Sequence, residues 1–139
     1  IAAVLHDAIE DAGMKECEIR SRFGDVVARI VVACSDTDVT PKPPWKARKK
    51  AYLDHLAEAD PATLCVSLAD KRHNARCIVE DLRAADDPAA FWRRFNASPI
   101  QQLWYYDKLA TAFEQRRPGR HADEFRRTIE ELERFVGGA

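Results

Sequence analysis

The chain has 139 residues, of which 46% are hydrophobic and 32% charged, and its formal net charge is -1 at pH 7. This length and composition indicate one globular domain with a buried core, and they exclude a disordered chain. A nucleic-acid polymer is an unsuitable partner because there is no basic excess, and no apolar run is long enough to cross a membrane.

The predicted elements are all helical and form a single all-α domain, because glycine is scarce and most prolines stand where a helix would begin. Asp60, Asp87 and Ser98 each precede a proline, which is typical of an N-cap followed by the first helical turn. Gly24 is predicted to end one helix and Asp25 to cap the next. In chain order, we predict helices over residues 1–11, 16–23, 25–35, 45–58, 61–84, 88–96, 99–115 and 123–136.

Residues 26–34 are rich in β-branched side chains, which favours a strand on propensity alone. We predict a buried helix there because no partner strand or hairpin signal appears nearby. Two loops are predicted, a polar and proline-rich one over residues 36–44 and a basic turn over residues 115–120. The chain starts inside an apolar run, so we expect the natural protein to have residues upstream of Ile1.

The four cysteines are Cys17, Cys34, Cys65 and Cys77, and none of them forms a C-x-x-C pair. This pattern predicts neither a zinc ribbon nor a thioredoxin-like site. Cys34 and Cys65 lie in apolar stretches and are predicted to be small core residues. Reduced thiols indicate a cytoplasmic protein.

Four titratable side chains lie within six positions after the first apolar run: His6, Asp7, Glu10 and Asp11. We expect them at the inner end or in the middle of a buried helix, where such groups are costly unless they are paired or bind a metal. Neighbours on a helix point about 100° apart, so His6 and Asp7 can both reach one ion. An isolated His-Asp pair is more often a metal-free hydrogen bond, so the interpretation depends on a second motif.

That second motif is LADKRHN, at the end of another apolar run. Asp70, His73 and Asn74 share one helix face at spacings of three and four residues. Because Asp70 follows the apolar residues Val66 and Leu68, its carboxylate is predicted to lie in the interior. There it can complete a mixed His/Asp site. Nitrogen and oxygen ligands of this kind suit Mn²⁺, Fe²⁺, Mg²⁺ or Zn²⁺.

The segments LHDAIED, FGDVVARIV and LADKRHNAR occur in this order and resemble the motifs of the HD superfamily of metal-dependent phosphohydrolases. In form they resemble the (p)ppGpp hydrolase domain of the RelA/SpoT family and its small stand-alone relatives. The resemblance covers residues 1–84 and implies an HD-domain helical bundle. Residues 85–139 match only loosely, as helical support.

The resemblance implies that His6, Asp7 and Asp70 are metal ligands, with Mn²⁺ as the expected ion. The family uses a fourth ligand, a histidine on an earlier helix. The other histidines of this chain all lie downstream, so we expect the fourth ligand in the upstream residues.

The resemblance also implies roles for the neighbouring polar residues. Glu10 and Asp11 match the acidic pair that positions and activates the attacking water. Asn74 and Arg76 match positions that contact the nucleotide, and an arginine can pair with a phosphate through a fork of donors. The family often has threonine where this chain has Cys77, so that contact is not implied here.

Other groups have plainer interpretations. Asp36 and Asp38 are predicted to cap or break the chain in a loop rather than bind metal. The basic run at residues 46–50 is predicted to be a solvated helix face. The alternative that one or two of its side chains face the phosphates stays open. The aromatic residues 104–106 are predicted to belong to the core rather than to stack on a base, and His73 is predicted to be structural.

We therefore predict a metal-dependent phosphohydrolase that removes the 3′-pyrophosphate from a nucleotide such as (p)ppGpp. Two alternatives stay open: an HD phosphohydrolase that acts on another nucleotide or phosphate ester, and a non-catalytic sensor that binds a nucleotide. The intact Glu10 and Asp11 argue against the sensor. Homo-oligomerisation is also left open.

Overall fold

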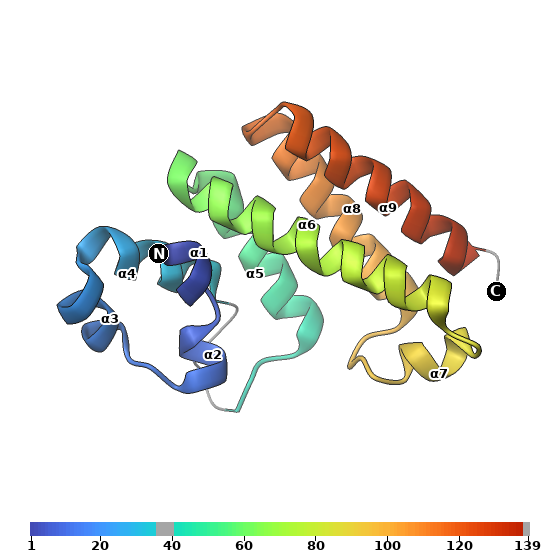
Figure 1. The fold of residues 1–139 in the computed structure, drawn as a ribbon, viewed down its shortest axis with the longest axis horizontal. Helices are drawn as coiled ribbons and strands as arrows, with labels where there is room; N and C mark the ends of the chain where they lie inside the picture. Colours follow the sequence, from blue (N-terminus) through green and yellow to red (C-terminus); the bar gives the residue numbers. More distant parts are fainter. Residues whose placement is uncertain (36–40, 138–139) are drawn as a thin grey trace. The chain divides into compact units, whose positions relative to one another are not determined.

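Figure 1 shows the fold, taken from a computed structural model that describes residues 1–35 and 41–137. All regular structure in these residues is α-helical, which confirms the all-α prediction. The helices are α1 (Ala2–Leu5), α2 (Ala8–Ala12), α3 (Glu16–Phe23), α4 (Asp25–Cys34), α5 (Trp45–Glu58), α6 (Pro61–Ala84), α7 (Pro88–Trp92), α8 (Pro99–Arg116) and α9 (Arg120–Gly137).

The prediction of one helix over residues 1–11 is wrong, because the chain forms α1 and α2 with a break at His6 and Asp7. Asp7 has φ -100° and ψ 6° and is the N-cap of α2. The His6 imidazole Nδ1 lies 2.9 Å from the Ala3 carbonyl oxygen, the acceptor that the Asp7 amide would use in a continuous helix. The preceding apolar run is also less buried than predicted, since Ile1 is 75% and Val4 86% exposed.

Three predicted helix starts are confirmed. The Asp60 carboxylate accepts from the Ala62 amide at 3.0 Å at the start of α6. Asp87 and Ser98 likewise accept backbone N–H groups at the starts of α7 and α8. These side chains satisfy amides that have no partner within their own helix.

The cap predicted at Asp25 is wrong. Gly24 both ends α3 and caps α4, with φ 86° and ψ 167°, a backbone conformation that glycine adopts without steric cost. Asp25 is the first residue of α4 instead, and its Oδ1 lies 3.2 Å from Nε of Arg20.

Two helix ends differ from the prediction by several residues. Helix α9 begins at Arg120, because the Gly119 carbonyl already accepts from the Ala122 amide at 2.9 Å. Helix α7 ends at Trp92, and the Phe95 amide then bonds to the Trp92 carbonyl at 3.1 Å in a tighter turn.

Residues 1–69 form one compact unit, made of α1 to α5 and the first part of α6. Helices α3 and α4 pack together around Ile19 and Val31, both fully buried. Residues 26–34 are confirmed as a helix, although α4 buries only one face, since Val26 is 61% exposed. Of the two predicted core cysteines, Cys34 is buried and Cys65 is exposed on α6.

Residues 70–139 form the second compact unit, which contains the rest of α6 together with α7, α8 and α9. Helices α8 and α9 lie side by side as an antiparallel hairpin (Figure 1). Phe113 of α8 and Phe125 of α9 are fully buried, with ring centroids 5.8 Å apart and an interplanar angle of 73°. Tyr105 and Tyr106 are buried as predicted, while Trp104 is half-buried.

The described part of the chain contains no helix that is both long and apolar enough to cross a membrane. The predicted loop over residues 36–44 is described only from residue 41 onward. Asp36 and Asp38 lie outside the described residues, so their predicted roles stay predictions.

Candidate functional site

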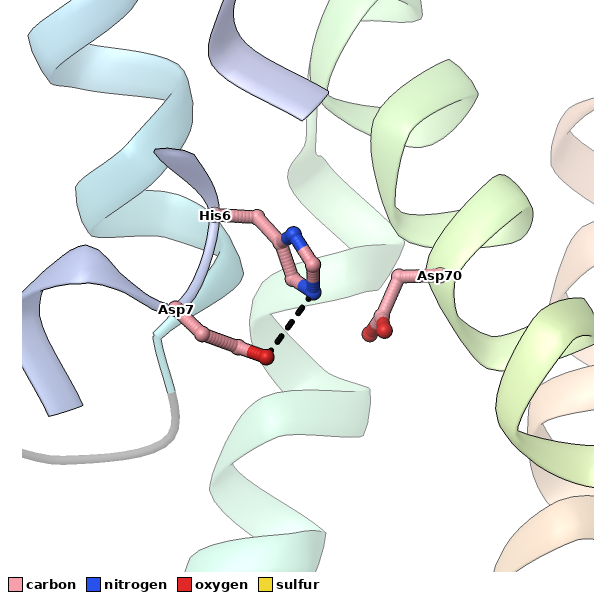
Figure 2. A group of neighbouring side chains, drawn as sticks. All are labelled: His6, Asp7 and Asp70. Atoms are coloured by element: carbon pink, nitrogen blue, oxygen red, sulfur yellow. Dashed lines mark ion pairs between the residues drawn. The ribbon is translucent and has the colours of Figure 1, made fainter. Parts of the chain in front are cut away.

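The break between α1 and α2 brings the His6 and Asp7 side chains together. His6 Nε2 lies 3.0 Å from Asp7 Oδ2, and the two side chains are 23% and 52% exposed. Figure 2 shows the imidazole and the carboxylate turned toward each other, with Asp70 beside them. The motif is therefore partly open to solvent rather than enclosed in a buried helix.

The backbone determines which nitrogen of His6 is available. A carbonyl oxygen only accepts hydrogen bonds, so the Nδ1 that lies 2.9 Å from the Ala3 carbonyl carries the proton. In the neutral imidazole, Nε2 then presents its lone pair toward Asp7. Metal-binding histidines commonly donate their other N–H in this way, which orients the ring.

This geometry suits a cation. A lone pair on His6 Nε2 and a carboxylate oxygen of Asp7, 3.0 Å apart, repel each other unless a proton or a metal ion lies between them. Two ligands of one metal, each about 2.1 Å from it and at a right angle, lie about 3 Å apart. The His6–Asp7 pair therefore has the spacing of two ligands on adjacent corners of one coordination sphere.

Asp70 is carried by α6, in the position directly after Ala69. Its side chain is 8% exposed, and its Oδ2 lies 2.6 Å from the Lys71 ammonium. Its Oδ1 accepts a 2.8 Å hydrogen bond from the Asn74 amide, one helical turn away. Both carboxylate oxygens are thus held by residues of the same helix, which orients the acid.

His6, Asp7 and Asp70 each offer one ligand atom, and these atoms all lie within 4.8 Å of one another (Figure 2). The donor set is one imidazole nitrogen and two carboxylates. Such a set suits Mn²⁺, Fe²⁺, Mg²⁺ or Zn²⁺ rather than a soft metal.

The predicted acidic pair follows in α2. Glu10 and Asp11 both lie in the first turn of this helix, after the Asp7 cap. The Glu10 carboxylate lies 3.9 Å from the Lys42 ammonium, and the Asp11 amide donates to the Asp7 carbonyl at 2.8 Å. The pair is thus attached to the candidate ligand Asp7 by the backbone of one short helix.

The two predicted nucleotide contacts differ in their surroundings. Asn74 is half-buried and turned to Asp70, whereas Arg76 is exposed and lies 3.3 Å from Glu80. Lys71 was not singled out in the sequence, although it follows Asp70 directly in the LADKRHN motif. Burial raises the pKa of Tyr106 to about 12, and the nearby Asp70 adds to this rise while Lys71 opposes it.

The remaining histidines lie on exposed positions. His73 Nε2 is 3.6 Å from the Cys77 thiol on the same face of α6. His121 contacts Arg72 at 3.1 Å, and His55 is exposed on α5. In the basic run, Lys46 and Lys50 are exposed, and Arg48 and Lys49 are half-buried. This agrees with a largely solvated face.

Comparison with known proteins decides the family. Residues 1–94 match the HD domain family, and this segment contains both the His6–Asp7 pair and Asp70. The chain belongs to the HD domain family. As a member of that family it has the helical fold predicted from its motifs.

Curated relatives narrow the resemblance within the HD family. The chain is 37% identical over 75 residues to the guanosine-3′,5′-bis(diphosphate) 3′-pyrophosphohydrolase MESH1 of Danio rerio, which covers 54% of this chain and 40% of the relative. It is 35% identical to the MESH1 of Homo sapiens over 75 residues, and this match covers 54% of this chain and 40% of the relative. A guanosine-3′,5′-bis(diphosphate) 3′-pyrophosphohydrolase of Haemophilus influenzae is 32% identical over 84 residues, covering 56% of this chain and 12% of the relative. The matches therefore span well under half the length of these relatives.

A solved structure has a similar fold. The chain matches the crystal structure of lmo0812 from Listeria monocytogenes EGD-e with a TM-score of 0.80, over 99% of this chain and 82% of that one. The sequences are 24% identical, so this likeness concerns the fold alone.

Proposed function

We propose that this HD-family protein is a metal-dependent phosphohydrolase that removes the 3′-pyrophosphate from (p)ppGpp. Water adds across the bond between the ribose 3′-oxygen and its diphosphate, which leaves a 3′-hydroxyl on GDP or GTP and releases pyrophosphate. The observation that carries the proposal is the His6 Nε2 atom, held 3.0 Å from Asp7 Oδ2 in a chain of the HD family. The named relatives supply the substrate class.

In this proposal His6, Asp7 and Asp70 hold one divalent ion, with Mn²⁺ as the first candidate. When bound, the ion supplies Lewis acidity toward a phosphoryl oxygen and makes water easier to deprotonate. The chain prepares for it by orienting its ligands: the Ala3 carbonyl fixes the His6 ring, and Asn74 fixes the Asp70 carboxylate. Ligands oriented before binding lose less conformational entropy when they bind.

Glu10 and Asp11 are proposed to orient the attacking water and accept its proton. A carboxylate in hydrogen-bond reach of the water can serve as a general base, since it takes up the proton as the water attacks. Asn74 and Arg76 are proposed to hold the nucleotide. The exposed Arg76 guanidinium can exchange Glu80, 3.3 Å away, for a phosphate, which offers charge-assisted bonds to both arms of the fork.

Two expectations stay predictions beside this function, the single domain and the cytoplasmic location, and homo-oligomerisation stays open. The metal identity as Mn²⁺ and the guanosine nucleotide are parts of the proposal.

The deciding experiment is hydrolysis of ppGpp by the full-length protein with Mn²⁺, with and without a chelator. We expect pyrophosphate release that the chelator stops, and a loss of about a hundredfold or more in kcat for Asp70→Asn. The matched control is Asp81→Asn on the same helix, because Asp81 is 55% exposed and pairs only loosely with Arg94 at 3.6 Å. This variant should retain the activity.

Other results would assign the site differently. Turnover of another nucleotide but not of ppGpp would keep the HD phosphohydrolase and reject the substrate. Equal activity in Asp70→Asn and wild type would reject the proposed metal ligand. Nucleotide binding without turnover or bound metal would favour the non-catalytic sensor.

A further inference from the structure

A charged cleft lies within the unit of residues 70–139, between α6 and α9. Two ion pairs join these helices, one between Arg72 Nη2 and Glu124 Oε2 at 2.6 Å and one between Arg83 and Glu131. The cleft has a volume of about 280 Å³. Its lining residues are Arg72, Arg76, Glu124, Arg127, Thr128 and Glu131, and none of them is a proposed metal ligand.

The two carboxylates of the cleft are already neutralised. Glu124 is paired with Arg72 at 2.6 Å and with Arg120 at 2.7 Å, and its pKa is lowered chiefly by the hydrogen bond from Arg120. Glu131 accepts from Nε of Arg83 at 2.8 Å. Neither acid is therefore left to neutralise a further arginine.

Arg127 is the arginine of the cleft that has no acidic partner among the described residues. It is exposed on α9 and lines the cleft. Among residues 1–35 and 41–137, no ion pair or hydrogen bond joins its guanidinium to another side chain, while Arg76 has only Glu80 at 3.3 Å. The network as a whole consists of five arginines and three glutamates: Arg72, Arg76, Arg83, Arg120, Arg127, Glu80, Glu124 and Glu131.

This local surplus of positive charge stands out in a chain whose formal net charge is -1. A guanidinium presents a planar fork of N–H donors and pairs well with phosphate oxygens. Small-molecule sites usually occupy roughly 300–1,000 Å³, so this cleft has room for a phosphate or diphosphate group rather than for a whole nucleotide.

We propose that the α6–α9 cleft is an anion site that binds a phosphate or diphosphate group through Arg127, with Arg72 as the fixed wall and Arg76 at the margin. Arg72 is held in place by Glu124 and by His121 at 3.1 Å, so it presents its charge without further ordering. Arg127 closes on the anion from α9. The site needs no metal, and Arg76 is the one lining residue that it shares with the nucleotide contacts proposed for the HD motif.

The test is calorimetric titration of the full-length protein with inorganic pyrophosphate, in a metal-free buffer of low ionic strength that contains EDTA. We expect saturable binding that weakens roughly tenfold in Arg127→Gln, the loss typical of one charge-assisted bond. The matched control is Arg134→Gln, which removes the same charge from an exposed position two turns further along α9. Arg134→Gln and Asp70→Asn should both bind as wild type does.

Three outcomes would overturn the proposal. Absence of binding to the wild type would remove the site. Equal weakening in Arg127→Gln and Arg134→Gln would show attraction to overall charge rather than to this cleft. Binding that is lost in Asp70→Asn but kept in Arg127→Gln would place the anion at the HD motif. Because no hydrolysis or metal enters the measurement, failure here leaves the proposed phosphohydrolase untouched.

Discussion

At the scale of single residues, the candidate site depends on hydrogen bonds that come from its own short segments. The Ala3 carbonyl orients His6, and Asn74 and Lys71 hold the two oxygens of Asp70. Each of these partners lies within four positions of the side chain that it orients. A rigid ligand therefore requires only that the local backbone be formed, and long-range packing has only to bring the segments together.

The role proposed for Glu10 can be separated from metal binding. Glu10→Gln keeps the size and polarity of the side chain but cannot accept a proton from water. We expect kcat for ppGpp to fall by about 10²- to 10⁴-fold, while the thermal stabilisation by Mn²⁺ stays as in wild type because the three ligands are intact. The control is Glu58→Gln, an exposed residue of α5, and steady-state kinetics with thermal melts are the measurements.

Loss of Mn²⁺ stabilisation in Glu10→Gln would instead make Glu10 a ligand. Unchanged kcat would remove it from the reaction and leave Asp11 as the candidate base. Either result is informative because Glu10 and Asp11 occupy successive positions of α2 and point about 100° apart.

The residue types of the site were predictable, and their local geometry was not. Titratable residues next to apolar runs marked His6, Asp7 and Asp70 as candidates, since such groups are costly without a partner, and the structure brings these three together. The break between α1 and α2 escaped prediction because no proline or glycine marks it. At the break, the His6 imidazole bonds to the Ala3 carbonyl and so competes with the backbone amide that would use this acceptor in a continuous helix. Propensity scales do not include such side-chain competition.

At the scale of elements, the N-cap of α6 is a quantitative test of how this helix begins. Asp60 accepts from the Ala62 and Thr63 amides at 3.0 and 3.3 Å, and from the Thr63 hydroxyl at 2.7 Å. These bonds, chiefly that from the Thr63 hydroxyl, lower the pKa of Asp60 from 3.8 to about 2. We expect Asp60→Ala to cost about 1 kcal/mol of unfolding free energy at pH 7, measured by urea denaturation.

The pH dependence of this effect has a definite sign. A carboxyl whose pKa is depressed on folding stabilises the protein above its ordinary pKa, and this contribution is lost as pH falls through the folded value. The difference between wild type and Asp60→Ala should therefore shrink between pH 3.8 and about 2. Asp54→Ala, at an exposed position of α5, should show little effect. A difference that does not vary with pH would contradict the role of the charged cap.

Helix positions were predicted well where a side chain acts on its own neighbours. Asp60, Asp87 and Ser98 cap their helices as predicted because the cap bonds reach only two or three residues ahead. Asp25 failed because Gly24 took the cap position. Cys65 is exposed although its neighbours along the chain are apolar, because burial depends on which face of α6 is covered, and that is decided by other elements.

At the scale of the whole molecule, the notable feature is where the two compact units meet along the chain. The division falls between Ala69 and Asp70, inside the 24-residue helix α6. No composition change or linker marks this position in the sequence, which is why one domain was predicted. Helix α6 therefore contributes residues to both units.

Continuity of α6 predicts that the two units unfold together. Ile19 in α3 is 0% exposed and Ile129 in α9 is 3% exposed, and the two residues belong to different units. The variants Ile19→Val and Ile129→Val therefore make the same change once in each unit. Each should cost about 0.5–1.5 kcal/mol. If the chain is one cooperative domain, hydrogen exchange of α4 and of α8 should accelerate equally in both variants. Acceleration confined to the unit that carries the substitution would instead show two domains that share a helix, and α6 would then fray from the mutated side.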